Sequence, residues 1–211
     1  MEGAALTAFV LASTVLAVTP GPGVVYIVTR TLARGLRAGF ASVAGVALGN
    51  LLNAIAAALG LAALLAVSRW AFTLLQVAGA LYLFWLGVRA LRAPPRAGDK
   101  GAELPIAAPW ALFRDGAMVA MLNPKTALFF AAFLPQFMDA GWPALPQALA
   151  LGAIFVLIAA CTDALYVAAA ARLAPSLAGC GNGGSGGRLA TAAVYFVLGL
   201  GSLFSGLRRP R

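Results

Sequence analysis

The chain has 211 residues, of which 62% are hydrophobic and 10% are charged, and its mean hydropathy is +0.93. This composition lies far outside the range of a soluble globular domain and is typical of an integral membrane protein. The net charge of +9 raises the question of nucleic-acid binding, but the basic residues stand between apolar runs, where membrane topology accounts for them. No nucleic-acid partner is therefore expected.

Six charge-poor runs are long enough to cross a hydrocarbon core of about 30 Å, which takes about 20 apolar residues in a helix. These runs lack the apolar/polar alternation of barrel strands, so helices are expected throughout. The fold class is therefore an all-α, multi-pass membrane protein in the lipid bilayer. The predicted spans are residues 4–29, 39–67, 70–88, 116–138, 145–171 and 189–207.

The first span contains the sequence TPGPG at residues 19–23. A proline lacks the amide hydrogen, and its ring clashes with the carbonyl four residues back, so this pair should break the helix inside the membrane. The fourth span has a corresponding break at Asn123-Pro124. In each pair the polar residue, Thr19 or Asn123, is predicted to cap a new half-helix that begins at Pro20 or Pro124.

A half-helix that begins within the membrane directs its free amide hydrogens and the positive end of its dipole at one spot. Such irregular backbone is tolerated only around a polar cavity. We therefore predict that the two starts converge on an anion, for which a carboxylate is the simplest candidate; a proline kink used only for packing is the alternative. The predicted substrate-binding residues are Thr19, Pro20, Gly21, Pro22, Gly23, Asn50, Asn53, Asn123, Pro124, Lys125 and Thr126.

Asn50 and Asn53 share one face of the second span with Gly49. Two interpretations stay open for them. They line the transport pathway, or they form interhelical hydrogen bonds beside the sequence GVALG, residues 45–49, which is a pattern for close helix packing.

Lys125 and Asp163 are the charges placed well inside the predicted spans, where each costs at least about 2.5 kcal/mol. Such residues are functional candidates by default. We predict that Lys125 supplies positive charge at the substrate carboxylate and that Asp163 is the ion-coupling residue, binding a coupling proton or the substrate ammonium. The structural alternatives are an ion pair between the two and a Lys125 side chain that extends to the membrane interface.

The chain divides into two sets of three spans joined by a polar linker near residues 93–108. An odd number of spans in each half reverses the orientation of the second half. This predicts two inverted three-helix repeats, residues 1–92 and 109–211, in a single transporter domain. Ten basic residues fall on one side and four on the other, so the positive-inside rule places the N-terminus outside, although three of the four are C-terminal arginines that argue against it.

The sequence disfavours several chemistries. It has no histidine and two cysteines, Cys161 and Cys180, without metal-ligand spacing, so no cofactor and no resident metal are predicted. An enzyme would need a nucleophile, a base or metal ligands that these spans do not offer, so we predict a non-enzyme. The glycine-rich residues 179–187 lack the Gly-Lys-Ser/Thr of a phosphate loop and indicate a flexible connection.

Three stretches together resemble the LysE/RhtB family of amino-acid exporters, in order and separation, over nearly the whole chain. They are TPGPGVVYIVTRTLARGLRAGFASVAGVALGN, LYLFWLGVRALR and NPKTALFFAAFLPQF. The resemblance implies a secondary transporter of the bacterial cytoplasmic (inner) membrane that exports an amino acid or a derivative, driven by an ion gradient, with the proton as the simplest coupling ion. It leaves open the substrate, a monomer or a homodimer, and export of another small solute or a metal cation on the same scaffold.

Overall fold

The computed structural model describes residues 3–59, 69–92, 109–139 and 142–178, together with residues 189, 192, 193, 195–197 and 200. Over these residues the chain is helical, and no β-strand occurs among them. The predicted linker, the glycine-rich segment and most of the sixth span lie outside the described residues. The elements are α1 (Gly3–Val18), α2 (Pro22–Arg34), α3 (Leu36–Ala58), α5 (Arg69–Arg92), α6 (Pro109–Met121), α7 (Pro124–Ala132), η1 (Leu134–Phe137) and α8 (Ala144–Ala178).

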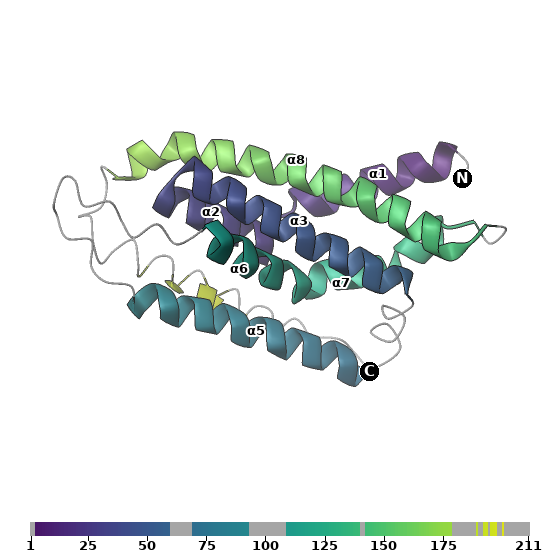
Figure 1. The fold of residues 1–211 in the computed structure, drawn as a ribbon, viewed down its shortest axis with the longest axis horizontal. Helices are drawn as coiled ribbons and strands as arrows, with labels where there is room; N and C mark the ends of the chain where they lie inside the picture. Colours follow the sequence, from purple (N-terminus) through teal and green to yellow (C-terminus); the bar gives the residue numbers. More distant parts are fainter. Residues whose placement is uncertain are drawn as a thin grey trace.

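The helices form an elongated bundle around α3, which packs against α2, α6 and α8, while α5 lies on the side opposite α8 (Figure 1). Thr31 in α2 and Val167 in α8 lie beside Gly39 near the start of α3, whereas Gly152 in α8 lies beside Ala54 near its end. Both helices therefore run antiparallel to α3. Successive described segments cross the bundle in alternating directions (Figure 1). The inverted repeat stays a prediction, because its last helix lies mostly outside the described residues.

Two described helices are long and apolar enough to cross a membrane, Leu36–Ala58 and Leu145–Ala174. Two bent pairs would add one span each: Ala5–Val18 with Pro22–Arg34, bent by 49°, and Pro109–Met121 with Pro124–Phe137, bent by 56°. The predicted breaks in the first and fourth spans are therefore present as bends between consecutive helices.

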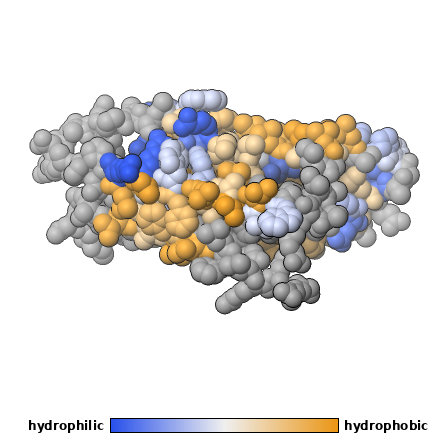
Figure 2. Space-filling model, turned by 90° about the horizontal axis from the view of Figure 1, so that it is seen from below, coloured by the Kyte–Doolittle hydropathy of each residue, from blue (hydrophilic) through white to orange (hydrophobic). Residues whose placement is uncertain are grey.

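Large apolar side chains cover much of the outer surface. Leu11, Val15, Leu81, Leu157 and Leu165 are 62% to 70% exposed. Soluble monomers rarely expose contiguous apolar area on this scale, so this surface is suited to contact with lipid. Seen from the α5 side, hydrophobic side chains occupy much of the middle of the molecule, and hydrophilic ones lie mostly toward its ends (Figure 2).

One end of the bundle carries most of the described arginines. Helices α2, α5 and α8 end there, and α3 and α6 begin there, on the left in Figure 1. We call it the arginine end. Its arginines are Arg30, Arg34, Arg37, Arg89, Arg92, Arg114 and Arg172. All seven were assigned to one side of the membrane from the sequence, so the bundle brings together the charges that the topology argument grouped.

The buried core consists of two clusters. The phenylalanine cluster contains Phe9, Ala17, Ala54, Phe129, Phe130, Leu134, Ala148, Leu151, Phe155 and Ala159. The tyrosine cluster contains Tyr26, Ile27, Val43, Val46, Leu83, Leu86, Val119, Ala120, Val167 and Tyr195, and it lies on the side of the arginine end. The helix breaks fall between the two clusters.

Glycines allow the backbones of α3 and α6 to touch. A Cβ atom at Gly45 would overlap the carbonyl group of Phe113, and one at Gly116 would lie 2.8 Å from the Ser42 carbonyl oxygen. Gly49 is equally close to the α6 backbone. The close-packing interpretation of residues 45–49 is thus confirmed, and this contact fixes the position of the broken α6–α7 segment against α3.

Two predicted spans differ in extent from the helices that contain them. The second span was expected to reach residue 67; α3 ends at Ala58, with Leu59 as its C-cap, and residues 60–67 lie outside the described part of the chain. Hydropathy does not mark this helix end because the sequence stays apolar beyond it. The fourth span was expected to start at residue 116, but α6 begins at Pro109 and includes Asp115. The predicted span began after Asp115 because it was drawn from a run without charges. In the fold, the Asp115 carboxylate is buried and paired with arginines.

We expect Gly45→Val to prevent correct packing of α3 on α6, because the added side chain meets backbone atoms that cannot rotate away. Overpacking typically costs about 1–3 kcal/mol, and a backbone clash should lie at or above the upper end. Ala44→Val is the matched control, since Ala44 is exposed on the neighbouring face. Thermal unfolding of the purified protein in detergent measures both; equal melting temperatures would contradict the contact.

Candidate functional site

The half-helix after the first break begins two residues later than predicted. α2 starts at Pro22, and its N-cap is Gly21, which has an extended backbone (φ −142°, ψ −174°) and offers no side-chain cap. Thr19 was expected to be the cap, but its hydroxyl donates to the Val15 carbonyl oxygen at 2.7 Å and so belongs to the end of α1. Either proline suits a first helical position, and the sequence alone could not decide that Pro22 takes it while Pro20 stays in the connection.

The second break has the predicted cap. Asn123 is the N-cap of α7, and Pro124 occupies its first position. The Asn123 side-chain oxygen accepts a hydrogen bond from the Lys125 amide at 3.1 Å, and its side-chain nitrogen donates to the Thr126 hydroxyl at 3.2 Å. The half-helix start in the fourth span is therefore confirmed to the residue.

A pocket lies at the two breaks, between the phenylalanine and tyrosine clusters. Phe155 and Ala159 contribute to it from the first cluster, and Val46 and Ala120 from the second. Most of the remaining lining comes from the breaks themselves. The full lining is Leu16, Ala17, Thr19, Gly21, Gly23, Val24, Val46, Asn50, Ala120, Asn123, Lys125, Thr126, Phe155, Ala159 and Asp163.

Both half-helices place their first amides at this pocket. The first intrahelical bond of α2 runs from the Val25 amide to the Gly21 carbonyl, so the amides of Gly23 and Val24 precede it. In α7 the first such bond runs from Ala127 to Asn123, leaving the Thr126 amide before it. Gly23, Val24 and Thr126 all line the pocket. An anion there would meet amide donors and the positive dipole ends of two helices.

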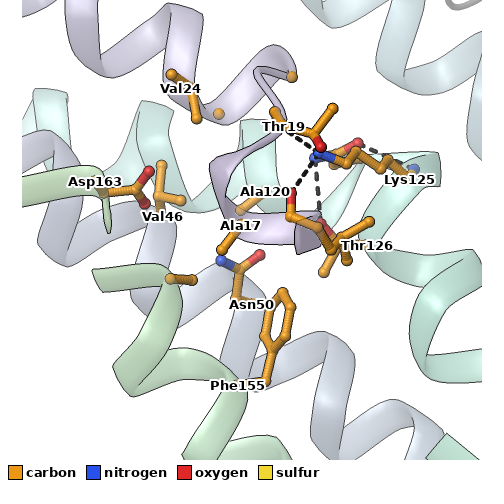
Figure 3. Close-up of a pocket in the computed structure, with 15 residues that line it drawn as sticks. Ala17, Thr19, Val24, Val46, Asn50, Ala120, Lys125, Thr126, Phe155 and Asp163 are labelled. Carbon is orange, nitrogen blue, oxygen red and sulfur yellow. Dashed lines mark hydrogen bonds between the residues drawn. The ribbon is translucent and has the colours of Figure 1, made fainter. Parts of the chain in front are cut away.

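Lys125 joins the second break to the first. Its Nζ donates to the carbonyl oxygens of Leu16 at 2.7 Å and Thr19 at 2.5 Å, at the end of α1 (Figure 3). These carbonyls lie beyond the regular hydrogen bonding of α1, at the negative end of its dipole, where a cation is stabilising. The side chain therefore lies at the pocket and does not extend away from it.

Asp163 faces the pocket from α8, on the side opposite Lys125 (Figure 3). It is 5% exposed. The ion pairs found among the described residues are Arg89–Asp115 and Arg114–Asp115, and they do not include Asp163. The alternative of a direct Lys125–Asp163 ion pair is therefore wrong for this conformation, because Lys125 bonds to the α1 carbonyls instead.

The pocket contains most, but not all, of the residues proposed from the sequence. Asn50 lines the pocket. Asn53 instead forms an interhelical hydrogen bond, in which its Nδ2 donates to the Ala120 carbonyl oxygen at 2.9 Å. The pocket-lining predicted residues are Thr19, Gly21, Gly23, Asn50, Asn123, Lys125, Thr126 and Asp163. Those not among its lining residues are Pro20, Pro22, Asn53 and Pro124, and the three prolines shape the breaks.

Sequence reasoning missed Asp115, which is 1% exposed. Its carboxylate accepts from Arg89 Nη1 at 2.8 Å and from Arg114 Nη2 at 3.3 Å, and the Tyr82 hydroxyl donates to it at 3.3 Å. The adjacent Arg114-Asp115 pair was the available signal, because a carboxylate beside a span start and an arginine is a candidate for burial as an ion pair.

These features are those of a polytopic helical membrane protein with a pocket at two helix breaks, and comparison with known proteins identifies its family. The family model of the LysE type translocator matches residues 14–204, and the chain belongs to this family. Its members are transporters and not enzymes. The matching proteins include a membrane protein of Vibrio cholerae, 36% identical over 79% of this chain and 80% of its own. No solved structure matches the chain.

Two further relatives have named activities. A homoserine/homoserine lactone efflux protein of Salmonella typhimurium is 34% identical over 82% of this chain and 83% of its own. A leucine efflux protein of Salmonella choleraesuis is 27% identical over 61% of this chain and 60% of its own.

We expect Asn123→Ala to destabilise the protein by about 1 kcal/mol, because it removes the N-cap of α7. Thr19→Val removes one bond to the end of α1 and should change stability by less than about 0.5 kcal/mol, since Thr19 is exposed and caps no helix start. Thermal unfolding in detergent compares the two. If Thr19→Val proves as destabilising as Asn123→Ala, Thr19 is more important to the first break than its contacts indicate.

Proposed function

We propose that this protein is a secondary transporter that exports an amino acid or an amino-acid derivative from the cytoplasm, coupled to proton movement in the opposite direction. The observation that carries the proposal is the charge arrangement of the pocket. Lys125 lies on one side and Asp163 on the other, and the starts of both half-helices contribute to the lining. A zwitterion with a carboxylate at one end and an ammonium at the other complements this arrangement. The efflux activities named for two relatives support the same class of substrate.

The substrate carboxylate binds at the half-helix starts and replaces the α1 carbonyl oxygens as the hydrogen-bond partner of Lys125. In the empty pocket the ammonium of Lys125 donates to neutral carbonyl oxygens of Leu16 and Thr19. A carboxylate is a stronger partner, because hydrogen bonds between two ionised groups are about twice as strong as neutral ones. The amides of Gly23, Val24 and Thr126 supply further donors. Glycine at positions 21 and 23 leaves room for the substrate to approach the backbone.

Asp163 binds either the substrate ammonium or a proton. With substrate present, the two charges of the zwitterion are matched by Lys125 and Asp163. After release outside, protonation of Asp163 removes the buried negative charge and lets the empty carrier return. Exchange of a substrate ammonium for a proton at one carboxylate is the simplest coupling scheme that this pocket supports.

The proposed movement uses the two apolar clusters as barriers. The tyrosine cluster lies between the pocket and the arginine end, and the phenylalanine cluster lies beyond the pocket toward the other end. Alternate opening of the clusters would expose the pocket to one side at a time. Two inverted repeats, which stay a prediction for this chain, are a common basis of such movements.

We expect Lys125→Ala to weaken binding of an amino acid strongly, and Lys125→Arg to weaken it less, because arginine keeps the positive charge. Loss of a charge-assisted bond is worth about 1.5–3 kcal/mol, or about tenfold to a hundredfold in KM. Export is measured with labelled homoserine in inverted membrane vesicles. Equal KM values for wild type and Lys125→Ala would place the carboxylate elsewhere.

Homoserine lactone gives a matched probe for the same variant, because its carboxyl group is esterified and carries no negative charge. If the lactone is exported, Lys125→Ala should raise its KM much less than that of homoserine. An equal rise for the two compounds would mean that Lys125 acts on the shape of the pocket and not on the carboxylate.

We expect Asp163→Asn to abolish the dependence of export on the proton gradient while substrate exchange continues, because the amide cannot bind a proton in the working pH range. The measurement compares efflux with and without an imposed gradient, and then exchange of internal for external label. Retention of the wild-type pH dependence would exclude Asp163 as the coupling site.

We further propose that the arginine end faces the cytoplasm, with the N-terminus outside. In a variant lacking Cys161 and Cys180, a thiol introduced as Pro143→Cys should react with an impermeant reagent in intact cells. Arg37→Cys, at the arginine end, should react only after permeabilisation. Reversal of the two patterns would reverse the orientation.

A further inference from the structure

The side chain of Arg30 contains a buried hydrogen-bond donor without a partner among the described residues. This donor is the Nε atom, and Arg30 lies near the end of α2. Leaving a buried donor unpaired is costly, and more so for a charged group, so each such atom needs an explanation. From the sequence, Arg30 was expected to contribute only to membrane topology.

The groups around Arg30 do not neutralise it. Its guanidinium carbon lies 5.1 Å from the centre of the Tyr26 ring, and the adjacent Thr29 hydroxyl lies 3.0 Å from the Tyr195 hydroxyl. Asp115 is close enough to interact electrostatically with Arg30. Both Asp115 oxygens, however, already accept hydrogen bonds from other arginines.

The local charge balance is therefore positive. Among the described residues, Arg89 and Arg114 pair with one buried carboxylate, that of Asp115, and Arg30 lies within electrostatic range of the same group. A second carboxylate would lower the electrostatic energy of this group. An arginine that offers Nε together with a terminal nitrogen can hold one carboxylate through two parallel hydrogen bonds, and no described group uses the Nε of Arg30.

Arg30 also lies on the route from the arginine end to the pocket. It follows the pocket residue Gly23 by seven positions, so it is on the same face of α2, about 10 Å further along the helix axis. Tyr26 lies between the two and belongs to the tyrosine cluster that closes this side of the pocket. A carboxylate arriving from the arginine end would meet Arg30 before Lys125.

We propose that Arg30, flanked by Tyr26 and Tyr195, forms a second carboxylate-binding site, where a substrate carboxylate is first held before the tyrosine cluster opens and admits it to the Lys125 pocket. This site rests on the proposed function, because it takes the same substrate. It adds a binding step on one face of the membrane only.

The test compares substrate affinity from the two faces. Transport of labelled homoserine is measured as a function of concentration in inverted and in right-side-out vesicles, for wild type, Arg30→Gln, Arg30→Lys and Arg37→Gln. Arg30→Gln should raise KM about tenfold on the face that bears the arginine end and less than about twofold on the other face. Arg30→Lys should lie between, because it keeps the charge but loses the paired geometry.

Arg37→Gln is the matched control, since it removes one positive charge from an exposed residue at the same end. It should leave KM on both faces near the wild-type value. Homoserine lactone, which has no free carboxylate, should show little change in KM with Arg30→Gln. Unfolding temperature and expression level report separately whether each variant folds.

Three results would overturn this site: unchanged KM in folded Arg30→Gln, an equal rise on both faces, or the same rise in Arg37→Gln. Each of them leaves the proposed function intact, provided that the wild type exports homoserine. If wild-type protein exports neither labelled homoserine nor labelled leucine, the proposed function fails, and this site fails with it.

Discussion

The organisation of this protein depends on the need to satisfy backbone polar groups where two membrane helices are interrupted. Lipid offers no hydrogen bonds, so amides and carbonyls freed by the prolines must find partners within the protein or face a polar cavity. The carbonyls that end α1 are met by the Lys125 ammonium, and the first amide after Asn123 is met by the Asn123 side chain. The amides that remain line the pocket. One lysine thereby connects the two breaks and leaves the other polar groups of the site available.

This arrangement needs a rigid support, which α3 provides. The glycines at 45 and 49 bring the α6 backbone against α3, and Asn53 adds a hydrogen bond to the carbonyl of Ala120 close to the second break. Asn50, one turn before Asn53, is thereby held at the pocket. The same helix face thus combines packing and site residues, which explains why the sequence could not separate the two roles of these asparagines.

How far the sequence predicts the structure differs from one feature to another. Asn123-Pro124 was located correctly, because only one cap and one proline are available there. TPGPG offers two prolines, and choosing between Pro20 and Pro22 requires knowing where α1 ends. Lys125 and Asp163 were singled out because isolated charges in apolar runs are costly, and both line the pocket. Their separation could not be predicted, since it depends on carbonyls at the end of α1 that no pattern of side chains reveals.

Asp115 and Arg30 show a more general limit of hydropathy analysis. Both stand at the edges of the predicted spans, where a charge needs no explanation. In the fold, Asp115 is enclosed by arginines from α5 and α6, and Arg30 is turned against Tyr26. Positive charges that count toward the predicted orientation of a membrane protein can therefore also lie within its helix bundle.

The contact between Lys125 and α1 also bears on how substrate binding could change the conformation. A ligand shifts an equilibrium only by its difference in affinity for the two states. In the proposed mechanism a carboxylate draws Lys125 away from the Leu16 and Thr19 carbonyls, so binding removes the link between the two breaks as it neutralises the lysine. A neutral solute of the same shape would leave that link in place. The contact that stabilises the empty pocket would therefore also favour carboxylate-bearing substrates, because only they supply the energy to replace it.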